Sequence, residues 1–284
     1  MQRRRNVYRV VKSLNNNGVL AVDVDTMTEV IVLGKGIGFG KKVNERFDVP
    51  KGTQIYALQK ETERGKSHNL ALNMAPVYLE ITSAIVQRAK ETMGPIDENV
   101  LLPLADHIEF AVKRIQNNNY ISNPMTHEIR ALFPQEFIAA EYGKRLSEER
   151  CSVKFNADEV AYIALHLHGA ADNQKVSEVM KQSQLVHDCL AQIEQNMKVT
   201  LNPSSLSYTR LLTHLKYMLA RMAKGEQIEM DMNDYIKHQY PKTFAFAKNL
   251  CDEISKKMDL KCKDEEIGYL AIHIERICMK NTSV

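Results

Sequence analysis

The chain has 284 residues, of which 44% are apolar and 26% charged, fractions typical of a soluble globular protein. No apolar run approaches the roughly 18 residues of a membrane-spanning helix, and the basic first residues lack the apolar stretch of a secretory signal. The five cysteines are odd in number and form no CxxC pair, which favours the reducing cytoplasm and argues against a structural zinc site.

The positive charge is concentrated at the start of the chain. Residues 1–58 contain ten Lys or Arg and five Asp or Glu residues, a net charge of +5, whereas the whole chain carries only +3. A basic head on a nearly neutral body suggests that the head binds a polyanion. The alternative is an ordinary solvated basic surface.

Residues 1–58 are predicted to be β structure. Short runs rich in Val, Leu and Ile are separated by turn-forming residues, and the expected strands are 7–14, 18–24, 29–33 and 54–58. Alternating glycines at 34, 36, 38 and 40 follow the third strand and are assigned to this β segment. Residues 59–68 are polar and are predicted to be a linker.

Helical periodicity replaces the β signals from residue 69 onward. Apolar residues recur three and four positions apart. The expected helices are 75–93, 100–116, 134–146, 157–170, 176–194, 204–223, 241–258 and 264–279. The predicted fold class is therefore α+β and multidomain, with a small all-β domain followed by helical bundles.

The helical region contains one module twice. When the chain is shifted so that His107 falls on His214, it aligns with itself without a gap at its landmarks. The same shift places His166 on His273, so the two histidines have the same spacing in each copy. The other five of the nine histidines face other residue types. The predicted domains are 1–58, a linker at 59–68, and two homologous helical domains at 69–172 and 173–284.

Several roles are open to the repeated histidines. A buried histidine with satisfied ring nitrogens is the usual outcome for one histidine on a helix, but here it would have to hold at two sites in both copies. Metal binding is disfavoured because His166 and His168 lie about 200° apart around a helix. Catalysis is disfavoured because no nucleophile, phosphate-loop or dinucleotide motif occurs, so we expect neither an enzyme nor a cofactor.

Phosphate acceptance is the remaining role. An imidazole with a pKa of about 6.5 is largely unprotonated and nucleophilic at neutral pH. The phosphorylated product carries new negative charge that can recruit Arg or repel a symmetry mate. Arg114 and Arg221 each follow the first histidine of a copy at the same spacing and could be such cations. They could equally be solvated surface arginines.

The basic head contains a candidate nucleic-acid surface. Asn15-Asn16-Asn17 lies between two strands, and Lys35 to Phe39 follow the third strand, with Lys41 and Lys42 behind. Asparagine amides can read base edges, an exposed Phe can stack on an unpaired base, and lysines bind phosphate. The alternatives are a hairpin turn for the asparagines and a core position for Phe39. The small core also makes a dimer plausible.

Over essentially its whole length the chain resembles the BglG/SacY family of transcriptional antiterminators. The segment Leu14 to Asn17 with Leu33 to Lys42 is similar to the family's RNA-binding signature, and the Gly-Lys-Gly-Ile-Gly-Phe-Gly-Lys-Lys run is most similar to that of its glucose-specific members. The four repeat histidines lie in motifs similar to the family's phosphorylatable ones.

The resemblance implies a mechanism. A dimeric head binds a hairpin in leader mRNA and prevents an overlapping terminator from forming. Sugar-transport enzyme II of the phosphotransferase system, here expected to be glucose-specific, and in addition HPr, phosphorylate His107, His166, His214 and His273. Phosphate on the first module disfavours the active dimer, and in some relatives phosphate on the second module activates.

Carried over to this sequence, the resemblance implies six RNA contacts: Lys12, Asn15, Asn17, Gly34, Lys35 and Phe39. Many relatives have Arg at the position of Lys35, and lysine lacks the planar, bidentate bonding of arginine. The alternative function is a DNA-binding transcription activator with the same regulation domains. The β character of the head disfavours it, because such activators usually carry helix-turn-helix heads.

Overall fold

The computed structural model describes residues 7–59, 61–62, 65–226 and 228–281. The chain divides into two compact units. The first comprises Met1–Asn123 and Phe133–Val176, and the second comprises Pro124–Leu132 and Ser177–Val284. The short segment Pro124–Leu132 is part of the first copy of the repeat in the sequence. Its contacts, however, place it in the second unit.

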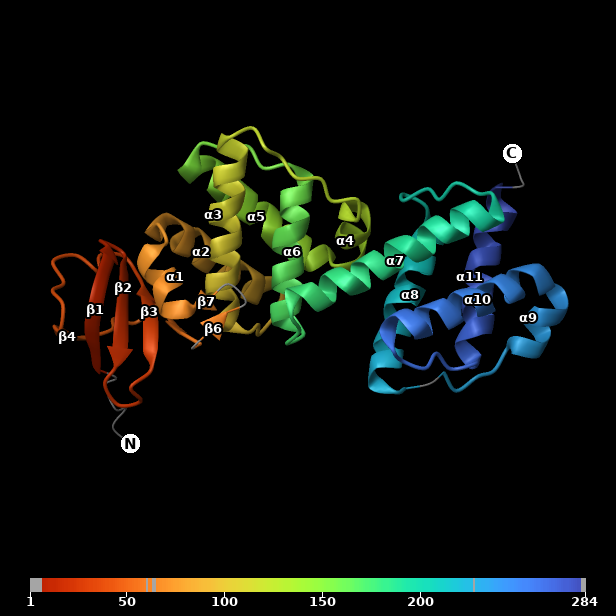
Figure 1. Ribbon diagram of the computed structural model, residues 1–284, viewed down its shortest axis with the longest axis horizontal. Helices are drawn as coiled ribbons and strands as arrows, with labels where there is room; N and C mark the ends of the chain where they lie inside the picture. Colours follow the sequence, from red (N-terminus) through yellow and green to blue (C-terminus); the bar gives the residue numbers. More distant parts are fainter. Residues whose placement is uncertain (1–6, 60, 63–64, 227, 282–284) are drawn as a thin grey trace. The chain divides into compact units, whose positions relative to one another are not determined.

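An antiparallel sheet of five strands forms the start of the described chain, in the order β4-β1-β2-β3-β5 (Figure 1). The strands are β1 Val7–Asn15, β2 Gly18–Asp23, β3 Glu29–Leu33, β4 Arg46–Asp48 and β5 Gln54–Ala57. Because side chains alternate between the faces of a strand, one face collects an apolar core. This core is made by Tyr8, Val10, Val19, Ala21, Val30, Val32, Ile37 and Phe47.

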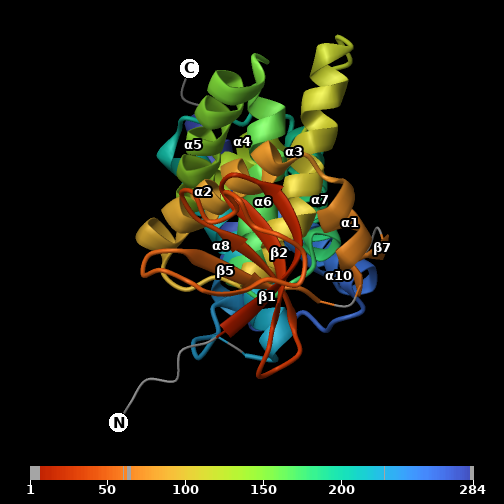
Figure 2. The same cartoon turned by 90° about the vertical axis from the view of Figure 1, so that its left-hand side faces the viewer.

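Helices of the same unit cover the opposite face of the sheet. Leu20 and Ile31 on that face are fully buried, and the Tyr56 hydroxyl lies 2.7 Å from Ser83 Oγ on α2 (Pro76–Met93). In Figure 2 the sheet faces the viewer, and Figure 1 places α1 (Ser67–Asn73) and α2 beside it. The sheet is thus buried on both faces, which explains why every residue of β2 is buried.

The predicted strands and long helices are confirmed, with α+β architecture. The remaining helices of the first copy are α3 Leu101–Gln116, α4 Thr126–Leu132, α5 Pro134–Cys151 and α6 Ala157–Ala171. Those of the second copy are α7 Val176–Met197, α8 Leu206–Lys224, α9 Asn233–Gln239, α10 Pro241–Met258 and α11 Glu265–Asn281.

Several short elements were not predicted from the sequence. The helices α1, α4 and α9 have seven residues each, too few to display a helical apolar period. The three-residue strand β4 is likewise too short to show alternation. The expected linker contains the small hairpin β6 (Glu61–Thr62) and β7 (Gly65–Lys66) and the start of α1.

The boundaries of corresponding helices use the same local chemistry. Pro134 and Pro241 occupy the first turn of α5 and α10, where proline's missing N–H is tolerated. Both helices end at a residue in the left-handed conformation, Ser152 and Asp259, which are also related by the repeat. Among the helices that the structure describes, none has the length and apolar character needed to cross a bilayer.

Candidate functional site

The fold brings the two histidines of the first copy together. His107 on α3 and His166 on α6 are far apart in the chain, yet their ring centroids are 5.1 Å apart. Tyr162, one helical turn before His166, places its ring 5.8 Å from His107. The His107 side chain is 14% exposed, so the pair lies just below the surface.

A fully buried carboxylate lies beside this pair. Glu159 on α6 accepts a 2.6 Å hydrogen bond from Arg114 Nη2 on α3, and its second oxygen lies 3.8 Å from His107 Nε2. Burial raises the pKa of Glu159, and the charge and hydrogen bond of Arg114 oppose that rise. The guanidinium also lies over the Phe110 ring, 4.8 Å from its centroid.

The second copy repeats the arrangement residue for residue. The rings of His214 on α8 and His273 on α11 are 4.8 Å apart, and Tyr269 stacks near His214 at 6.5 Å. Glu266 accepts hydrogen bonds from Arg221 Nε at 2.5 Å and from Nη2 at 2.8 Å. Glu266 Oε2 lies 3.7 Å from His214 Nε2.

The histidines of the second copy are neutral at physiological pH. Burial lowers the pKa of His214 to about 3, with smaller effects from His273 and Arg221. Burial also lowers the pKa of His273, assisted by Arg276 and Arg210. The approach of His214 to Glu266 is therefore a contact of a neutral ring with a carboxylate and not an ion pair. A neutral imidazole has the lone pair that a nucleophile requires.

The structure excludes one of the two roles that the sequence left open for the repeated arginines. Arg114 and Arg221 are not solvated surface residues, since their side chains are only 12% and 22% exposed. Each is bound to a buried glutamate, Glu159 or Glu266, to which the sequence alone gave no role. The available signal was the identity of Glu159 with Glu266 under the repeat, together with that of the two tyrosines.

His168 has different surroundings from His166. Its Nδ1 lies 2.8 Å from Glu136 Oε1, and its ring stacks on Phe133 with centroids 3.8 Å apart. The second copy replaces this pair by a hydrogen bond from Thr243 to Glu275 at the same repeat positions. Among the described residues, no group of three or more His, Cys, Asp or Glu side chains is arranged to hold a metal ion.

The predicted RNA residues gather at one end of the sheet. The asparagines form the β1–β2 hairpin turn, which was one of the two roles predicted for them. They also form hydrogen bonds with the glycine-rich run that follows β3. Asn17 accepts from Gly34 N through its carbonyl at 2.9 Å and from Gly36 N through Oδ1 at 3.0 Å. The run at 35–40 is a series of turns and not the β segment that was expected.

Phe39 is displayed at the surface by this turn. Its side chain is 75% exposed, which excludes the core position that the sequence left open. Gly38 packs so closely on the hairpin that an added Cβ would lie 2.0 Å from the Asn15 carbonyl oxygen. Lys35 is exposed on the same run. The asparagine turn and the glycines thus form a closely packed support for an exposed aromatic ring and an exposed cation.

Two of the predicted RNA residues also contact helices of the first unit. Lys12 Nζ donates to the Leu72 carbonyl at 2.9 Å. Asn15 Nδ2 donates to Glu80 Oε1 on α2 at 2.8 Å, and the other Glu80 oxygen accepts from Arg150 at 3.0 Å. The six residues therefore divide into an open group at the tip and a group of two held against the helices.

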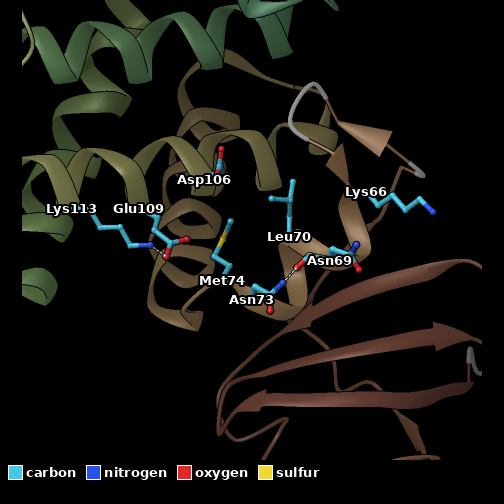
Figure 3. Close-up of a pocket in the computed structure, with 8 residues that line it drawn as sticks. All are labelled: Lys66, Asn69, Leu70, Asn73, Met74, Asp106, Glu109 and Lys113. Atoms are coloured by element: carbon cyan, nitrogen blue, oxygen red, sulfur yellow. Dashed lines mark hydrogen bonds and ion pairs between the residues drawn. The ribbon is translucent and has the colours of Figure 1, made fainter.

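A cleft of about 340 Å³ lies between α1 and α3, beside the helix that carries His107 (Figure 3). Lys66, Asn69 and Asn73 line one wall and Asp106, Glu109 and Lys113 the other. Glu109 and Lys113 are paired at 2.8 Å, so the charges facing the cleft largely cancel. This balance gives the cleft no preference for an anion or a cation.

Comparison with known proteins identifies the domains. A family model described as the CAT RNA binding domain matches residues 8–65, and one described as the PRD domain matches 80–170 and 187–277. The chain belongs to the BglG family of transcription antiterminators. Members of this family are RNA-binding regulators and not enzymes. The RNA-binding match and the β sheet exclude the helix-turn-helix head expected of a DNA-binding activator.

Full-length relatives support this assignment. The chain is 31% identical to protein GlcT of Staphylococcus aureus over 277 residues, covering 94% of this chain and 95% of that protein. It is 27% identical to the transcription antiterminator LicT of Bacillus subtilis, covering 95% and 98%. The solved crystal structure of GlcT CAT-PRDI matches 58% of this chain and 98% of its own, with 28% identity and a TM-score of 0.50.

Proposed function

We propose that this antiterminator binds a leader-mRNA hairpin as a homodimer, through the tip of its sheet, and thereby prevents terminator formation. Phe39 stacks on an unpaired base, Lys35 binds phosphate, and Asn17, Gly34, Asn15 and Lys12 complete the surface. The observation that supports this proposal most is the large exposed fraction of the Phe39 side chain, which lies on a turn fixed by backbone hydrogen bonds. Residues 1–58 form the RNA-binding domain, and residues 69–172 and 173–284, after a linker at 59–68, regulate it.

Substitution of Phe39 by Ala tests the RNA surface. We expect leader-hairpin binding to weaken by at least about fivefold in a gel-shift titration, since stacking of one base contributes about 1–3 kcal/mol. Met27→Ala is the matched control, because Met27 is also exposed and apolar but lies in the β2–β3 turn at the opposite end of the sheet. Equal affinity of both variants for the hairpin would reject the stacking role. Light scattering with and without RNA would test the dimer.

The paired histidines are the proposed phosphate acceptors. A phosphorylated transport enzyme II, and HPr as a second donor, transfers phosphate to His107, His166, His214 or His273. The unprotonated ring nitrogen supplies the electron pair of the new N–P bond, and the donor atom keeps the electrons of the bond that breaks. The neutral state of His214 and His273 supports this chemistry.

Phosphopeptide mapping after incubation with each phosphorylated donor tests the acceptors directly. We also expect His107→Asp, a partial phosphate mimic, to lower antitermination in a reporter strain at least severalfold. His127→Asp is the control, because His127 is exposed on α4 and its repeat counterpart is already Asp234. Unchanged reporter output for His107→Asp would remove His107 from the switch.

Glucose is the proposed signal. The sequence of the glycine-rich run and the relatives named as GlcT support a glucose transport operon as the target. We expect reporter induction by glucose in a host with this chain, and loss of sugar control when the glucose-specific enzyme II is deleted. Retained control by another sugar would reassign the signal and leave the RNA-binding proposal intact.

A further inference from the structure

Each histidine site contains an arginine and a histidine that share one buried carboxylate. Glu159 lies between Arg114 and His107, and Glu266 occupies the same place in the second copy. The Nε2 atoms of His107 and His214 are shielded from solvent next to these carboxylates. The duplication of the arrangement indicates that it serves the module and is not particular to one copy.

A phosphoryl group on such a histidine would meet an unfavourable charge. At neutral pH a phosphoryl group carries between one and two negative charges, and a like charge in a buried setting is strongly destabilising. The carboxylate lies 3.7–3.8 Å from the histidine ring before any phosphate is added. The site can therefore hold phosphate only if a cation compensates the added charge.

A cation is already present in the same cluster. The guanidinium of arginine binds carboxylate and phosphate with the same forked geometry, and either oxyanion can be its partner. Because the arginine and the histidine contact one carboxylate, a phosphoryl group on the ring lies within reach of the arginine side chain.

We propose that Arg114 and Arg221 are phosphate-sensing residues that leave Glu159 and Glu266 for the phosphoryl oxygens when the neighbouring histidine is phosphorylated. This inference rests on the proposed phosphorylation of the histidines. Its consequence is structural, because Arg114 on α3 joins α6 through Glu159, and Arg221 on α8 joins α11 through Glu266. Phosphate thus removes the ionic link between the two helices that carry the histidines, and leaves a buried carboxylate unpaired.

The two copies differ in how firmly the arginine is held. Arg114 donates to one oxygen of Glu159 from Nη2, whereas Arg221 donates from two nitrogens to both oxygens of Glu266. A fork with two bonds resists exchange more than a single bond does. The first module should therefore change its arginine partner more completely at the same degree of phosphorylation.

The test uses the full chain, phosphorylated chemically with phosphoramidate so that no protein donor is required. Phosphohistidine is followed by ³¹P NMR, and arginine Nε–H resonances are followed in ¹⁵N-arginine-labelled protein. We expect the Arg114 and Arg221 Nε–H resonances to shift when the histidines become phosphorylated. We expect His107→Gln to abolish the Arg114 shift and His214→Gln the Arg221 shift.

Two neutralising variants separate phosphate sensing from a merely structural bridge. Glu266→Gln frees Arg221 and removes the repelling charge, so phosphohistidine should persist at least threefold longer. Arg221→Gln removes the compensating cation and should shorten its lifetime by at least threefold, with partial rescue by Arg221→Lys. A bridge with only a structural role would move both lifetimes in the same direction. Arg88→Gln, which breaks the exposed pair with Glu91, is the control and should change neither.

The outcomes distinguish this inference from the proposed function. Phosphorylated histidines with unmoved arginine resonances, or with both variants changing lifetime in one direction, would overturn the arginine exchange and leave phosphorylation standing. Failure of all four histidines to accept phosphate, from phosphoramidate and from the phosphorylated protein donors, would reject the proposed phosphorylation on which this inference rests. The resonance shift itself is measured in the unsubstituted chain, so this part of the test does not depend on the folding of a variant.

Discussion

The two regulatory modules have kept the same histidine cluster while their short helices have diverged. In the second copy, α9 is fastened to its own module, where Asn233 Nδ2 donates to the Asp264 carbonyl on the approach to α11 and Asn233 Oδ1 accepts from Gly268 N. The corresponding helix of the first copy, α4, packs on α8 of the second copy.

The contacts of α4 explain its membership of the second unit. Glu128 lies 3.1 Å from His187 Nδ1 on α7, and the Leu132 carbonyl accepts a 2.7 Å hydrogen bond from Lys216 on α8. His187 and Lys216 face Glu80 and Glu109 in the first copy, so the residues that hold α4 are particular to the second copy. The comparison teaches that duplication has constrained the cluster of His, Glu and Arg much more than the packing around it.

The largest expected effect tests whether the shared cluster stabilises both modules. Glu159→Ala and Glu266→Ala each leave an arginine in a largely buried site, and removal of one partner from a buried pair costs about 3–5 kcal/mol. We expect the larger loss at Glu159, because Arg114 is less exposed than Arg221 and can reach solvent less easily. Urea unfolding measures the free energy of unfolding of both variants. A loss below about 1 kcal/mol at both sites would contradict a stabilising role.

The second prediction tests where the short helices belong. Ile129 in α4 and Ile236 in α9 are related by the repeat and are both buried, so truncation to Ala should cost about 2–5 kcal/mol at each. Hydrogen exchange should then separate them. Ile129→Ala should weaken protection in α8, whereas Ile236→Ala should weaken it in α11. Loss of protection in α6 with α8 unchanged, on truncation of Ile129, would break the comparison.

A third prediction concerns acid stability. His214 is neutral in the folded protein, with its pKa lowered to about 3, while the unfolded chain takes up the proton near pH 6.5. Stability from this group is therefore complete above pH 6.5 and is lost as pH falls toward about 3. We expect a loss of about 2 kcal/mol between pH 7 and pH 5. In His214→Asn this dependence should shrink, whereas in His127→Asn it should remain. Equal pH slopes in all three proteins would contradict the neutral, buried state.

The smallest expected effect concerns Lys216 and Glu109, which occupy the same repeat position in the two copies but have different contacts. Lys216→Ala removes a hydrogen bond to the α4 carbonyl and should cost about 1 kcal/mol. Glu109→Ala, at the equivalent place, removes a partly exposed pair with Lys113 and should cost no more than about 0.5 kcal/mol. Thermal unfolding of both variants measures the difference. Equal losses would indicate that α4 is held by its apolar residues and not by Lys216.

The sequence predicted the architecture because long elements have strong periods. The strands at 7–14 and 29–33 and the eight long helices were recognisable from alternation and from three-four spacing. The repeat added what a single helix cannot give. It selected His107, His166, His214 and His273 from nine histidines, because only these four align as histidine with histidine.

The tertiary structure decided what these residues touch. Each pair of histidines meets across two helices, and a buried glutamate lies between histidine and arginine. The helix α4 packs on the second copy. All of these are contacts between residues far apart in the chain. Periodicity reports which face of an element is buried, but not which neighbour buries it. The same holds at the tip of the sheet, where the sequence offered Phe39 as core or surface. The close approach of Gly38 to the asparagine turn, a packing contact, places that ring in solvent.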